Sequence, residues 1–383
     1  MRIGVLTGGG DVPGLNVVIK CIAEGAAERG WSVVGIHRGW LGLLSLDPND
    51  RTTWRRWTSE LTRGAVRTIG REGGTMLHTS RIEPQLLPHA LAPERLKGLY
   101  GDNNKHIDAT PHILEAVQAL ALDAVVAVGG DGTLRFAARL AEEGVAVISI
   151  PKTMDNDVYG TDYAIGFSTA ITRSVDAISA LRTSAGSHER ILIVELFGRR
   201  SGQTALYAGL LANADRTFIA ECPFDLARAA QLLEADRVAS ASRYAIAVIS
   251  EGAHPQDGVL HESALVDAYG RGRLGGVGET LAGACRQASA EDVIVQNLGY
   301  LMRSGPPDAT DRQIALAFGS LAVELLAAGR SGVMCAVQNG KLAAVDIRAP
   351  LQGQKRVSVA QSYDENTYRP KLSKMEGMPL FGF

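Results

Sequence analysis

Apolar and polar positions alternate on two scales along this chain, and each scale predicts a different kind of element. Short runs rich in Val, Ile and Ala predict buried strands at residues 3–7, 32–36, 124–128, 145–150, 191–196 and 244–250. Longer stretches rich in Ala, Leu, Glu and Arg predict helices at residues 14–29, 133–143, 168–184 and 225–239. Because strands that alternate with helices pair in parallel through helical crossovers, the pattern predicts an α/β fold with doubly wound sheets.

Chain length and the less periodic segments predict how the chain is organised. The chain has 383 residues, which exceeds what one hydrophobic core usually supports, so two domains are expected. Residues 46–66 are expected to form an irregular segment on the surface. Residues 101–111 and 252–275 are expected to form loops. The chain after residue 350 has little periodicity, and residues 363–383 are expected to wrap a surface or an interface.

Composition excludes several classes of function. The formal net charge of −2 offers no electrostatic basis for binding nucleic acid or an acidic membrane. No apolar run approaches the ~20 residues of a membrane span, and strand-like residues 3–6 begin the chain without a signal-peptide pattern. The four cysteines are scattered without metal-binding spacing, as expected of reduced thiols. These features predict a cytoplasmic protein with no nucleic-acid or membrane partner.

Glycine-rich segments near predicted strands are the first candidates for phosphate binding. Residues 7–16 (TGGGDVPGLN) follow a strand and open a helix, where glycine lets the backbone approach a phosphate and the helix N-terminus offers N–H groups. Residues 73–81 (GGTMLHTSR) add hydroxyls and Arg81, and arginine bridges phosphate oxygens bidentately. Taken alone, the first segment is as well explained by a tight turn, and the second is better explained by a solvated loop.

The segment GGDGT (residues 129–133) is a stronger signal. After its two glycines, Asp131 could coordinate Mg²⁺ while backbone N–H groups face the phosphates. The alternative makes Asp131 a helix cap. Glycine on both sides favours the functional interpretation, because a cap needs no such backbone freedom.

The segment PKTMDND (residues 151–157) is the most specific motif in the chain. It directly follows the predicted strand at residues 145–150, and strand ends are where an open α/β sheet builds its active site. Asp155 and Asp157 are candidates for a general base and for a partner of a sugar hydroxyl or a metal. The alternative is an acidic turn, and the position after a buried strand favours function.

Charged positions also flank the later strands. Arg190 and Arg199 stand at the two ends of the predicted strand at residues 191–196, where they could meet phosphates or form surface ion pairs. Glu251 ends the strand at residues 244–250, and residues 300–303 (YLMR) precede a predicted helix near residue 308.

The set as a whole resembles the phosphofructokinase family. Its motifs are, in chain order, TGGGDVPGLN, GGTMLHTSR, GGDGT, PKTMDND, SHER, ELFGRRSG, SEG and YLMRSG. GGDGT also occurs in NAD kinases and lipid kinases, whereas PKTMDND followed by GTDYAIGFSTA and SHER is specific to this family. The resemblance runs from residue 1 to about residue 347 and implies two Rossmann-like α/β domains with the active site in the cleft between them. Residues 1–166 with 302–347 would form the phosphate-donor domain, 167–301 the sugar-phosphate domain, and 348–383 a C-terminal tail.

The resemblance also implies roles for individual residues. Asp155 would take the proton from the sugar 1-hydroxyl, Asp131 would bind Mg²⁺, and Arg199 would steady charge on the transferred phosphoryl group. The implied catalytic set is Asp155, Arg199, Thr153 and Lys152. The implied nucleotide site is Gly10, Arg81, Ile82, Gly130, Asp131, Gly132 and Thr133. The implied sugar-phosphate site is Thr153, Asp155, Asp157, Phe197, Gly198, Arg199, Glu251, Tyr300 and Arg303, together with Arg190, which would reach into a neighbouring subunit.

The implied activity is Mg²⁺-dependent phosphoryl transfer from ATP to the 1-hydroxyl of fructose 6-phosphate, which gives fructose 1,6-bisphosphate in glycolysis. Positioning and charge neutralisation dominate the catalysis of such in-line transfer. Because the family shares sites between subunits, the resemblance implies a homodimer or homotetramer.

The phosphate donor needs its own argument, because two positions favour different donors. In this family a glycine at position 132 leaves room for the α-phosphate of ATP, whereas an aspartate there favours pyrophosphate. A lysine at position 152 is typical of pyrophosphate users. The combination of Gly132 and Lys152 is similar to the plant and protist ATP-using group. A side chain at 132 would exclude ATP sterically, while Lys152 only adds a cation, so ATP is preferred and pyrophosphate is the alternative.

Three departures from the family pattern qualify the expectation. The second cross-subunit arginine falls on Ile294, and the usual histidine of the 6-phosphate segment is Tyr300. Of two basic effector positions, Lys20 matches and Glu24 does not, so regulation by nucleotide diphosphate or phosphoenolpyruvate is not supported. Ile294 motivates another acceptor, such as sedoheptulose 7-phosphate. A catalytically inactive regulatory subunit is the alternative from another class, and the presence of Asp131, Asp155 and Arg199 argues against it.

Overall fold

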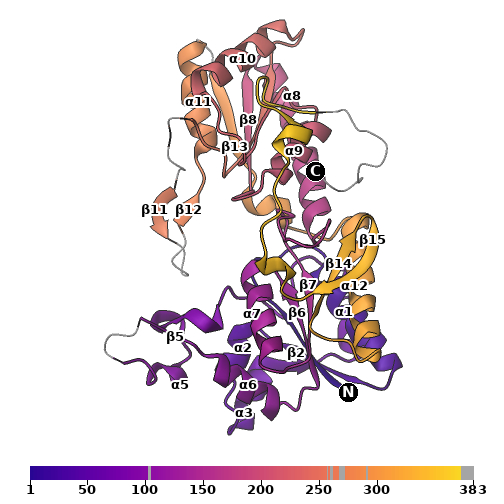
Figure 1. Ribbon diagram of the computed structural model, residues 1–383. Helices are drawn as coiled ribbons and strands as arrows, with labels where there is room; N and C mark the ends of the chain where they lie inside the picture. The colour runs from indigo at the N-terminus through magenta and orange to yellow at the C-terminus, as the bar shows by residue number, and fades with distance from the viewer. Residues whose placement is uncertain (102–104, 257, 259–261, 267–271, 290–291, 372–383) are drawn as a thin grey trace. The chain divides into compact units, whose positions relative to one another are not determined.

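The computed structural model describes residues 1–101, 105–256, 258, 262–266, 272–289 and 292–371. The chain divides into two compact units, and each is built around its own sheet (Figure 1). Unit 1 comprises Met1–Thr153, Val158–Gly166 and Ser304–Gln354. Unit 2 comprises Met154–Asp157, Phe167–Arg303 and Lys355–Phe383.

Unit 1 contains a seven-stranded sheet in the order β15-β14-β7-β6-β1-β2-β3. The five inner strands run parallel, and the two edge strands pair antiparallel with their neighbours. All six residues of β6 are buried, as expected for a strand covered on both faces. The strands are β1 (Arg2–Thr7), β2 (Ser32–Ile36), β3 (Thr58–Glu60), β6 (Ala124–Gly129), β7 (Val147–Pro151), β14 (Val333–Gln338) and β15 (Lys341–Asp346).

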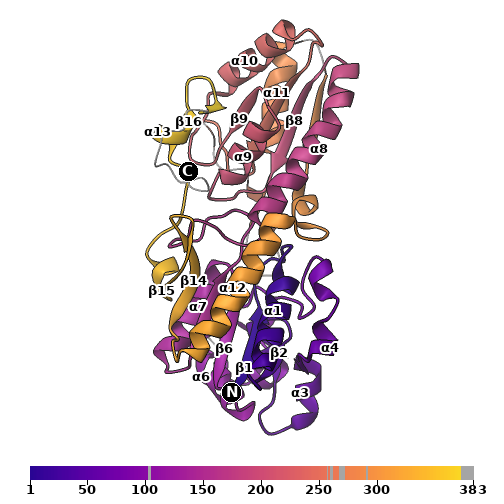
Figure 2. The same ribbon diagram turned by 90° about the vertical axis from the view of Figure 1, so that its right-hand side faces the viewer.

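The helices of unit 1 follow the apolar periodicity of the sequence. Helix α1 (Leu15–Glu28) buries residues spaced three and four apart, which makes one apolar face. That face lies beside α12 (Ala309–Ala327), where a Cβ on Gly319 would lie 2.8 Å from Cys21 Cβ, so the glycine allows close packing (Figure 2). The remaining helices are α2 (Trp40–Ser45), α3 (Arg51–Trp57), α4 (Arg63–Val66), α5 (Glu94–Lys97), α6 (Thr110–Ala119) and α7 (Asp131–Glu142). Short elements complete the unit: β4 (Leu87–Pro88), β5 (His106–Ile107), η1 (Ile69–Arg71), η2 (Pro84–Leu86), η3 (His89–Leu91) and η5 (Ala349–Leu351).

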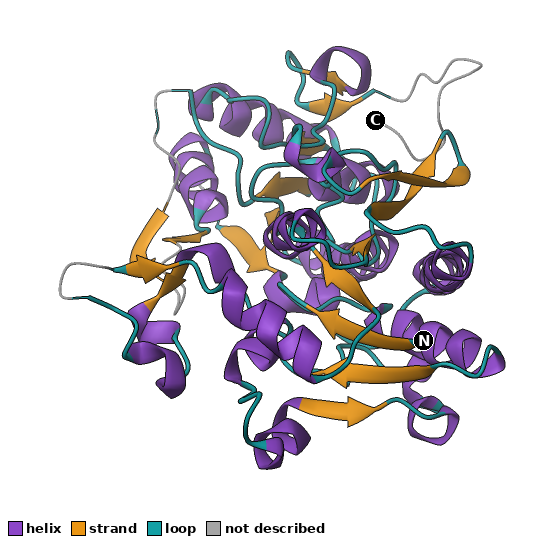
Figure 3. Cartoon of the chain, turned by 60° about the horizontal axis from the view of Figure 1, so that its bottom comes forward, coloured by secondary structure: helices purple, strands orange, loops and turns teal. Residues whose placement is uncertain are grey.

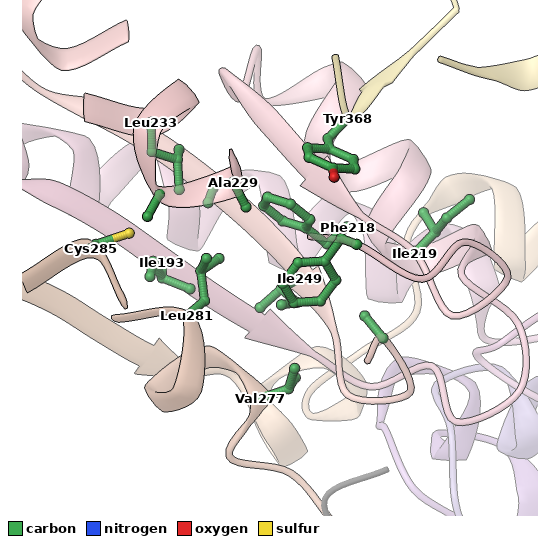
Figure 4. Close-up of a cluster of buried hydrophobic side chains, with 14 of the residues drawn as sticks. Ile193, Phe218, Ile219, Ala229, Leu233, Ile249, Val277, Leu281, Cys285 and Tyr368 are labelled. Carbon is green, nitrogen blue, oxygen red and sulfur yellow. The ribbon is translucent and has the colours of Figure 1, made fainter. Parts of the chain in front are cut away.

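Unit 2 contains a parallel four-stranded sheet in the order β13-β8-β10-β9. Alternate residues of its central strands enter two different cores, as the two-residue period of a strand requires. Ile191 and Ile193 pack with α10 and α11, whereas Leu192 and Val194 pack with α8 and α9. Figure 4 shows part of the first cluster, and Figure 3 shows strands with helices packed beside them. The elements are α8 (Phe167–Ser187), β8 (Ile191–Leu196), α9 (Gln203–Leu211), β9 (Arg216–Phe218), α10 (Leu226–Ala239), β10 (Ala245–Ser250), α11 (Val277–Ala288) and β13 (Val293–Asn297).

The segment after residue 354 contributes to the core of unit 2. Tyr363 and Tyr368 are buried in the same cluster as Phe218, and the Tyr363 hydroxyl donates to the Thr217 carbonyl at 2.6 Å. Residues 363–371 therefore lie along unit 2 with most side chains exposed or half-buried, while their two tyrosines enter its core, and residues 372–383 lie outside the described part of the chain. The segment also forms α13 (Val359–Ser362), β16 (Tyr363–Asp364) and β17 (Arg369–Pro370).

The structure confirms the α/β fold class with two parallel-dominated sheets and corrects three segments. Residues 46–66 are not irregular, because they form α3, β3 and α4. The predicted loop at 101–111 contains β5 and the start of α6, and the one at 252–275 contains the antiparallel pair β11 (Glu262–Val266) and β12 (Gly272–Leu274). The short strands among them cannot show a period in the sequence, and α3 buries none of its residues, so it has no apolar face that a pattern could indicate. Across the described residues, no helix is both long and apolar enough to span a membrane.

Candidate active site

In unit 1 the glycine motifs meet at the carboxyl edge of the sheet. The N–H of Gly8, after β1, donates to the Val128 carbonyl at 2.9 Å, and the N–H of Lys152, after β7, donates to the Gly129 carbonyl at 3.0 Å. A Cβ on Gly8 would lie 2.4 Å from Thr133 Oγ1, so only glycine permits this approach. The N–H of Gly9 reaches the Ser80 carbonyl at 2.8 Å, which brings residues 73–81 to the same edge. The structure thus brings together the predicted nucleotide-site segments.

Asp131 is the first residue of α7, and Gly130 is the N-cap. The alternative that Asp131 is only a helix cap therefore does not hold. Asp131 is half-buried at a helix N-terminus, where the helix dipole favours anions. No group of three or more His, Cys, Asp or Glu side chains suited to a metal occurs among the described residues. Mg²⁺ commonly binds through one or two carboxylates with substrate phosphates and water, so a single Asp131 fits a metal shared with a phosphate donor.

The Lys152 side chain connects two segments of unit 1 and also carries a positive charge. Its side chain is 3% exposed, and Nζ donates to the Gly10 carbonyl at 2.6 Å. A Cβ on Gly9 would lie 3.0 Å from the same Nζ, which shows how closely the lysine approaches the glycine turn. The ammonium therefore holds the loop after β1 against the end of β7.

Glu83 is a residue of this edge that the sequence did not single out. A Cβ on Gly132 would lie 3.1 Å from Glu83 Oε1, so the carboxylate stands over the position where a side chain at 132 would project. Arg135 Nη1 lies 3.9 Å from Glu83 Oε2. Ile82 is buried and Arg81 is half-buried, so this segment turns its carboxylate toward the start of α7. The only signal in the sequence was its place two residues after Arg81.

The motif at residues 151–157 is divided between the units: Lys152 and Thr153 belong to unit 1, and Asp155 and Asp157 belong to unit 2. Asn156 has a left-handed backbone (φ 51°), which asparagine tolerates better than most residues. Its buried amide donates to Gln203 Oε1 at 2.9 Å at the start of α9. The turn alternative is thus correct as local structure, and the anchored turn presents the half-buried Asp155 and Asp157.

In unit 2 the predicted sugar-phosphate residues follow three neighbouring parallel strands. Residues 197–199 follow β8, Glu251 follows β10, and the 3₁₀ helix η4 (Gly299–Arg303) follows β13. Hydrogen bonds join the strand ends: the Glu251 N–H donates to the Leu196 carbonyl at 2.8 Å, and the Phe197 N–H donates to the side-chain Sδ of Met302 at 3.2 Å. The structure therefore brings together Phe197, Gly198, Arg199, Glu251, Tyr300 and Arg303.

Arg190 stands apart from this group. It precedes β8, so the six residues of the strand separate it from Phe197, a span of about 20 Å at the usual rise of a strand. Arg190 Nη1 lies 3.4 Å from Asp292 Oδ2 of the same chain. Ile294 packs against the apolar cluster that contains Leu192. Within one chain, Arg190 and Arg199 therefore lie at opposite ends of the same strand.

Glu195 is a second residue of the site that no sequence motif singled out. It is 2% exposed in β8 and accepts hydrogen bonds from the Gly278 N–H at 2.9 Å and Asn297 Nδ2 at 2.7 Å. The Gly276 N–H lies 3.1 Å from Oε2. The carboxylate thus joins the end of β8 to the start of α11 and the end of β13. A glutamate in an apolar strand was the available signal, because a buried charge requires such partners.

Glu251 has an altered acidity in this environment. Burial raises the pKa of Glu251 to about 7, and the negative charge of Glu195 adds to the increase. The backbone of Gly198 and the charge of Arg199 act in the opposite direction. A carboxyl group that ionises near neutrality at a strand end is a frequent feature of functional sites.

An α/β sheet edge with glycine turns, a lysine and a helix N-terminus is suited to binding phosphates, and comparison with known proteins specifies the family. The sequence model of the phosphofructokinase family matches residues 2–326, so this chain belongs to the phosphofructokinase family. An ATP-dependent 6-phosphofructokinase of Chloroflexus aggregans is 37% identical over 350 residues, which is 90% of each chain. A pyrophosphate–fructose 6-phosphate 1-phosphotransferase of Streptomyces coelicolor is 38% identical over 365 residues, covering 94% of this chain and 97% of that protein. The crystal structure of a pyrophosphate-dependent phosphofructokinase from Marinobacter aquaeolei has the same fold, with a TM-score of 0.75, 18% identity, and coverage of 97% of this chain and 89% of that one.

Proposed function

We propose that this protein transfers the terminal phosphoryl group of ATP to the 1-hydroxyl of fructose 6-phosphate, giving ADP and fructose 1,6-bisphosphate in glycolysis. The observation that carries the choice of donor is Gly132, which places no side chain at the second residue of α7. The ATP-dependent names of the relatives from Chloroflexus and Mycobacterium support the same donor. A glycolytic role also supports a cytoplasmic location.

In the proposed reaction, Asp155 accepts the proton of the 1-hydroxyl as its oxygen attacks the terminal phosphorus. The bond from that phosphorus to the bridging oxygen breaks, and ADP leaves with the electron pair. Arg199 neutralises charge on the transferred group, and a bound Mg²⁺, held by Asp131, would supply further neutralisation. Because transfer of this kind depends on placement and charge compensation, Lys152 and Thr153 would contribute by shaping the glycine turn.

The same proposal divides the remaining residues between two subsites. The donor would bind along Gly10, Arg81, Ile82, Gly130, Gly132 and Thr133 in unit 1. The acceptor would bind along Asp157, Phe197, Gly198, Glu251, Tyr300 and Arg303, which are residues of unit 2. The donor domain would follow residues 1–166 with 302–347, and the acceptor domain would follow residues 167–301. Residues 348–383, expected as a C-terminal tail, divide between units 1 and 2 after Gln354. Arg190 would serve the site of a neighbouring subunit, which requires a homodimer or homotetramer.

A second candidate differs only in its donor. Lys152 and the pyrophosphate-using relative from Streptomyces coelicolor favour pyrophosphate. The deciding experiment measures turnover of fructose 6-phosphate with ATP and with pyrophosphate at equal concentrations. We expect turnover with ATP. Turnover with pyrophosphate alone would overturn the choice of donor.

The acceptor is tested in the same assay with sedoheptulose 7-phosphate in place of fructose 6-phosphate. We expect the higher kcat/KM with fructose 6-phosphate, and a clear preference for the heptulose would replace the assignment. Absence of turnover with every donor and acceptor, from a folded protein, would instead support an inactive regulatory subunit.

The acidity of Glu251 gives a prediction about pH. If its carboxylate accepts a hydrogen bond from a sugar hydroxyl, the ionised form binds, so kcat/KM for the acceptor should rise with pH through about 7. Glu195→Gln removes the neighbouring negative charge, which lowers the pKa of Glu251 and moves this rise to lower pH. Ionisation of the substrate is the same for both enzymes and cancels in the comparison. A pH profile that is unchanged in Glu195→Gln, and also in Glu251→Gln, would contradict the assignment.

A further inference from the structure

An exposed aromatic ring covers a buried cation at the end of β13. The Tyr300 side chain is 66% exposed, whereas Arg303 is 8% exposed. The Arg303 guanidinium carbon lies 4.4 Å from the centre of the Tyr300 ring. This reverses the usual distribution, in which aromatic rings are buried and charges reach water. The Tyr300 ring is therefore not held in place by burial in the core.

The local backbone explains why these two side chains meet. Gly299–Arg303 form the 3₁₀ helix η4, in which side chains three residues apart stand above one another. Met302 is buried in the core cluster of unit 2 and accepts the Phe197 N–H at 3.2 Å, which fixes η4 against the end of β8. Tyr300 and Arg303 thus project together from a short, anchored turn.

Phe197 contributes a second aromatic ring from a different strand end. Its centre lies 6.0 Å from the Arg303 guanidinium carbon and 6.0 Å from the centre of the Tyr300 ring, and the two rings are nearly perpendicular, at 89°. We call these two rings, of Phe197 and Tyr300, the aromatic bracket. Both lie within the usual range of a cation–π contact with Arg303.

Such contacts restrict an arginine in a particular way. A ring against the face of the guanidinium holds its plane, while the N–H donors lie within that plane and point outward from its edges. A planar group held in one orientation suits the bidentate recognition of a phosphate or carboxylate. Pre-orientation increases affinity, because less freedom is lost on binding.

We propose that the aromatic bracket pre-orients Arg303 for bidentate recognition of the phosphate carried by the acceptor sugar, and that Tyr300 is a positioning residue. The proposal rests on the proposed function, since it concerns the acceptor site of that reaction. Tyr300 acts through its ring, so its hydroxyl is not required. Replacement by phenylalanine, which keeps the ring, should therefore have a smaller effect than replacement by leucine.

The test compares Tyr300→Phe with Tyr300→Leu in the full-length protein. Tyr300→Leu should raise KM for fructose 6-phosphate roughly tenfold, the scale of a partly desolvated cation–π contact, with kcat changed less than about twofold. Tyr300→Phe keeps the ring and should raise KM much less than Tyr300→Leu does. The matched control is Tyr244→Leu, because Tyr244 packs on Arg182 at 5.8 Å at the opposite end of the sheet. That variant loses a tyrosine–arginine contact away from the proposed acceptor site, including a hydrogen bond from Arg182 Nη1 to the Tyr244 hydroxyl at 3.2 Å, and should leave KM unchanged.

A double-mutant comparison distinguishes loss of the orientation of Arg303 from a nonspecific structural effect of the Tyr300 substitution. In an Arg303→Ala background, Tyr300→Leu should cause no further rise in KM, because the ring has lost the group it orients. An unchanged KM in Tyr300→Leu, or an equal rise in Tyr300→Phe, would overturn the proposal. If the native protein turns over no sugar phosphate, the proposed function fails. Calorimetric binding of fructose 6-phosphate to the same variants then tests the bracket independently, and equal dissociation constants for the native protein and Tyr300→Leu would overturn it.

Discussion

Replacing Asp155 with serine should lower kcat by about 10²- to 10⁴-fold, the usual contribution of a positioned general base. Asp155 lies beside Asn156, whose amide is tied to Gln203 in the turn at residues 154–157. Serine keeps the turn and removes the carboxylate, so the attacking hydroxyl must give its proton to water. The KM for the donor should change little, because Asp155 belongs to the acceptor side of the proposed reaction. Initial rates under saturating donor and acceptor measure the effect.

The control for this substitution is Asp176→Ser, which removes an exposed carboxylate from α8 in the same unit. It should retain the native rate. Equal far-ultraviolet circular dichroism and melting temperature in the two variants would exclude unfolding as the cause. A rate for Asp155→Ser within tenfold of the native rate would refute the role of Asp155 as the base.

Gly132→Asp should lower kcat/KM for ATP by roughly 10- to 100-fold, as expected when 1–3 kcal/mol of steric and electrostatic strain is introduced. A Cβ at this position would already lie 3.1 Å from Glu83 Oε1. An aspartate adds a second carboxylate beside Glu83 and fills the space proposed for the α-phosphate. Pyrophosphate has no such group, so its kcat/KM should fall less. The ratio of the two constants is the measurement.

Two companion variants separate the effects of size and charge. Gly132→Ala adds only a methyl group, and the end of the flexible Glu83 side chain can move away, so ATP use should fall less than in Gly132→Asp. Adding Glu83→Gln to Gly132→Asp should recover part of the loss by removing the repulsion between carboxylates. An equal decrease with ATP and pyrophosphate in Gly132→Asp would argue against Gly132 as the position that selects the donor.

The parts of the fold with strong local signals were predictable from the sequence. The strands β1, β6 and β8 and the helices α1 and α8 lie within a few residues of the predicted bounds. Their apolar runs or helical periods extend over five residues or more, so local pattern and tertiary burial agree. The strand β3 was missed because three residues cannot display a period, and β11 was missed because only three of its five residues, ESALV, are apolar. The burial of Tyr363 and Tyr368 could not be predicted for another reason. Their cluster with Phe218 depends on contacts across about 150 residues of chain.

The sequence by itself determined the family and the chemistry of the site, because glycine turns and acidic motifs after strands are local features whose spacing survives in the linear chain. Only the tertiary structure revealed that Glu83 stands over Gly132, that Lys152 holds Gly10, and that Glu195 joins three segments. Each of these contacts joins residues far apart in sequence, and no local periodicity encodes such a contact. The aromatic bracket combines the two kinds of feature. The spacing of Tyr300 and Arg303 is local in the sequence, whereas the approach of Phe197 to Arg303 depends on the fold.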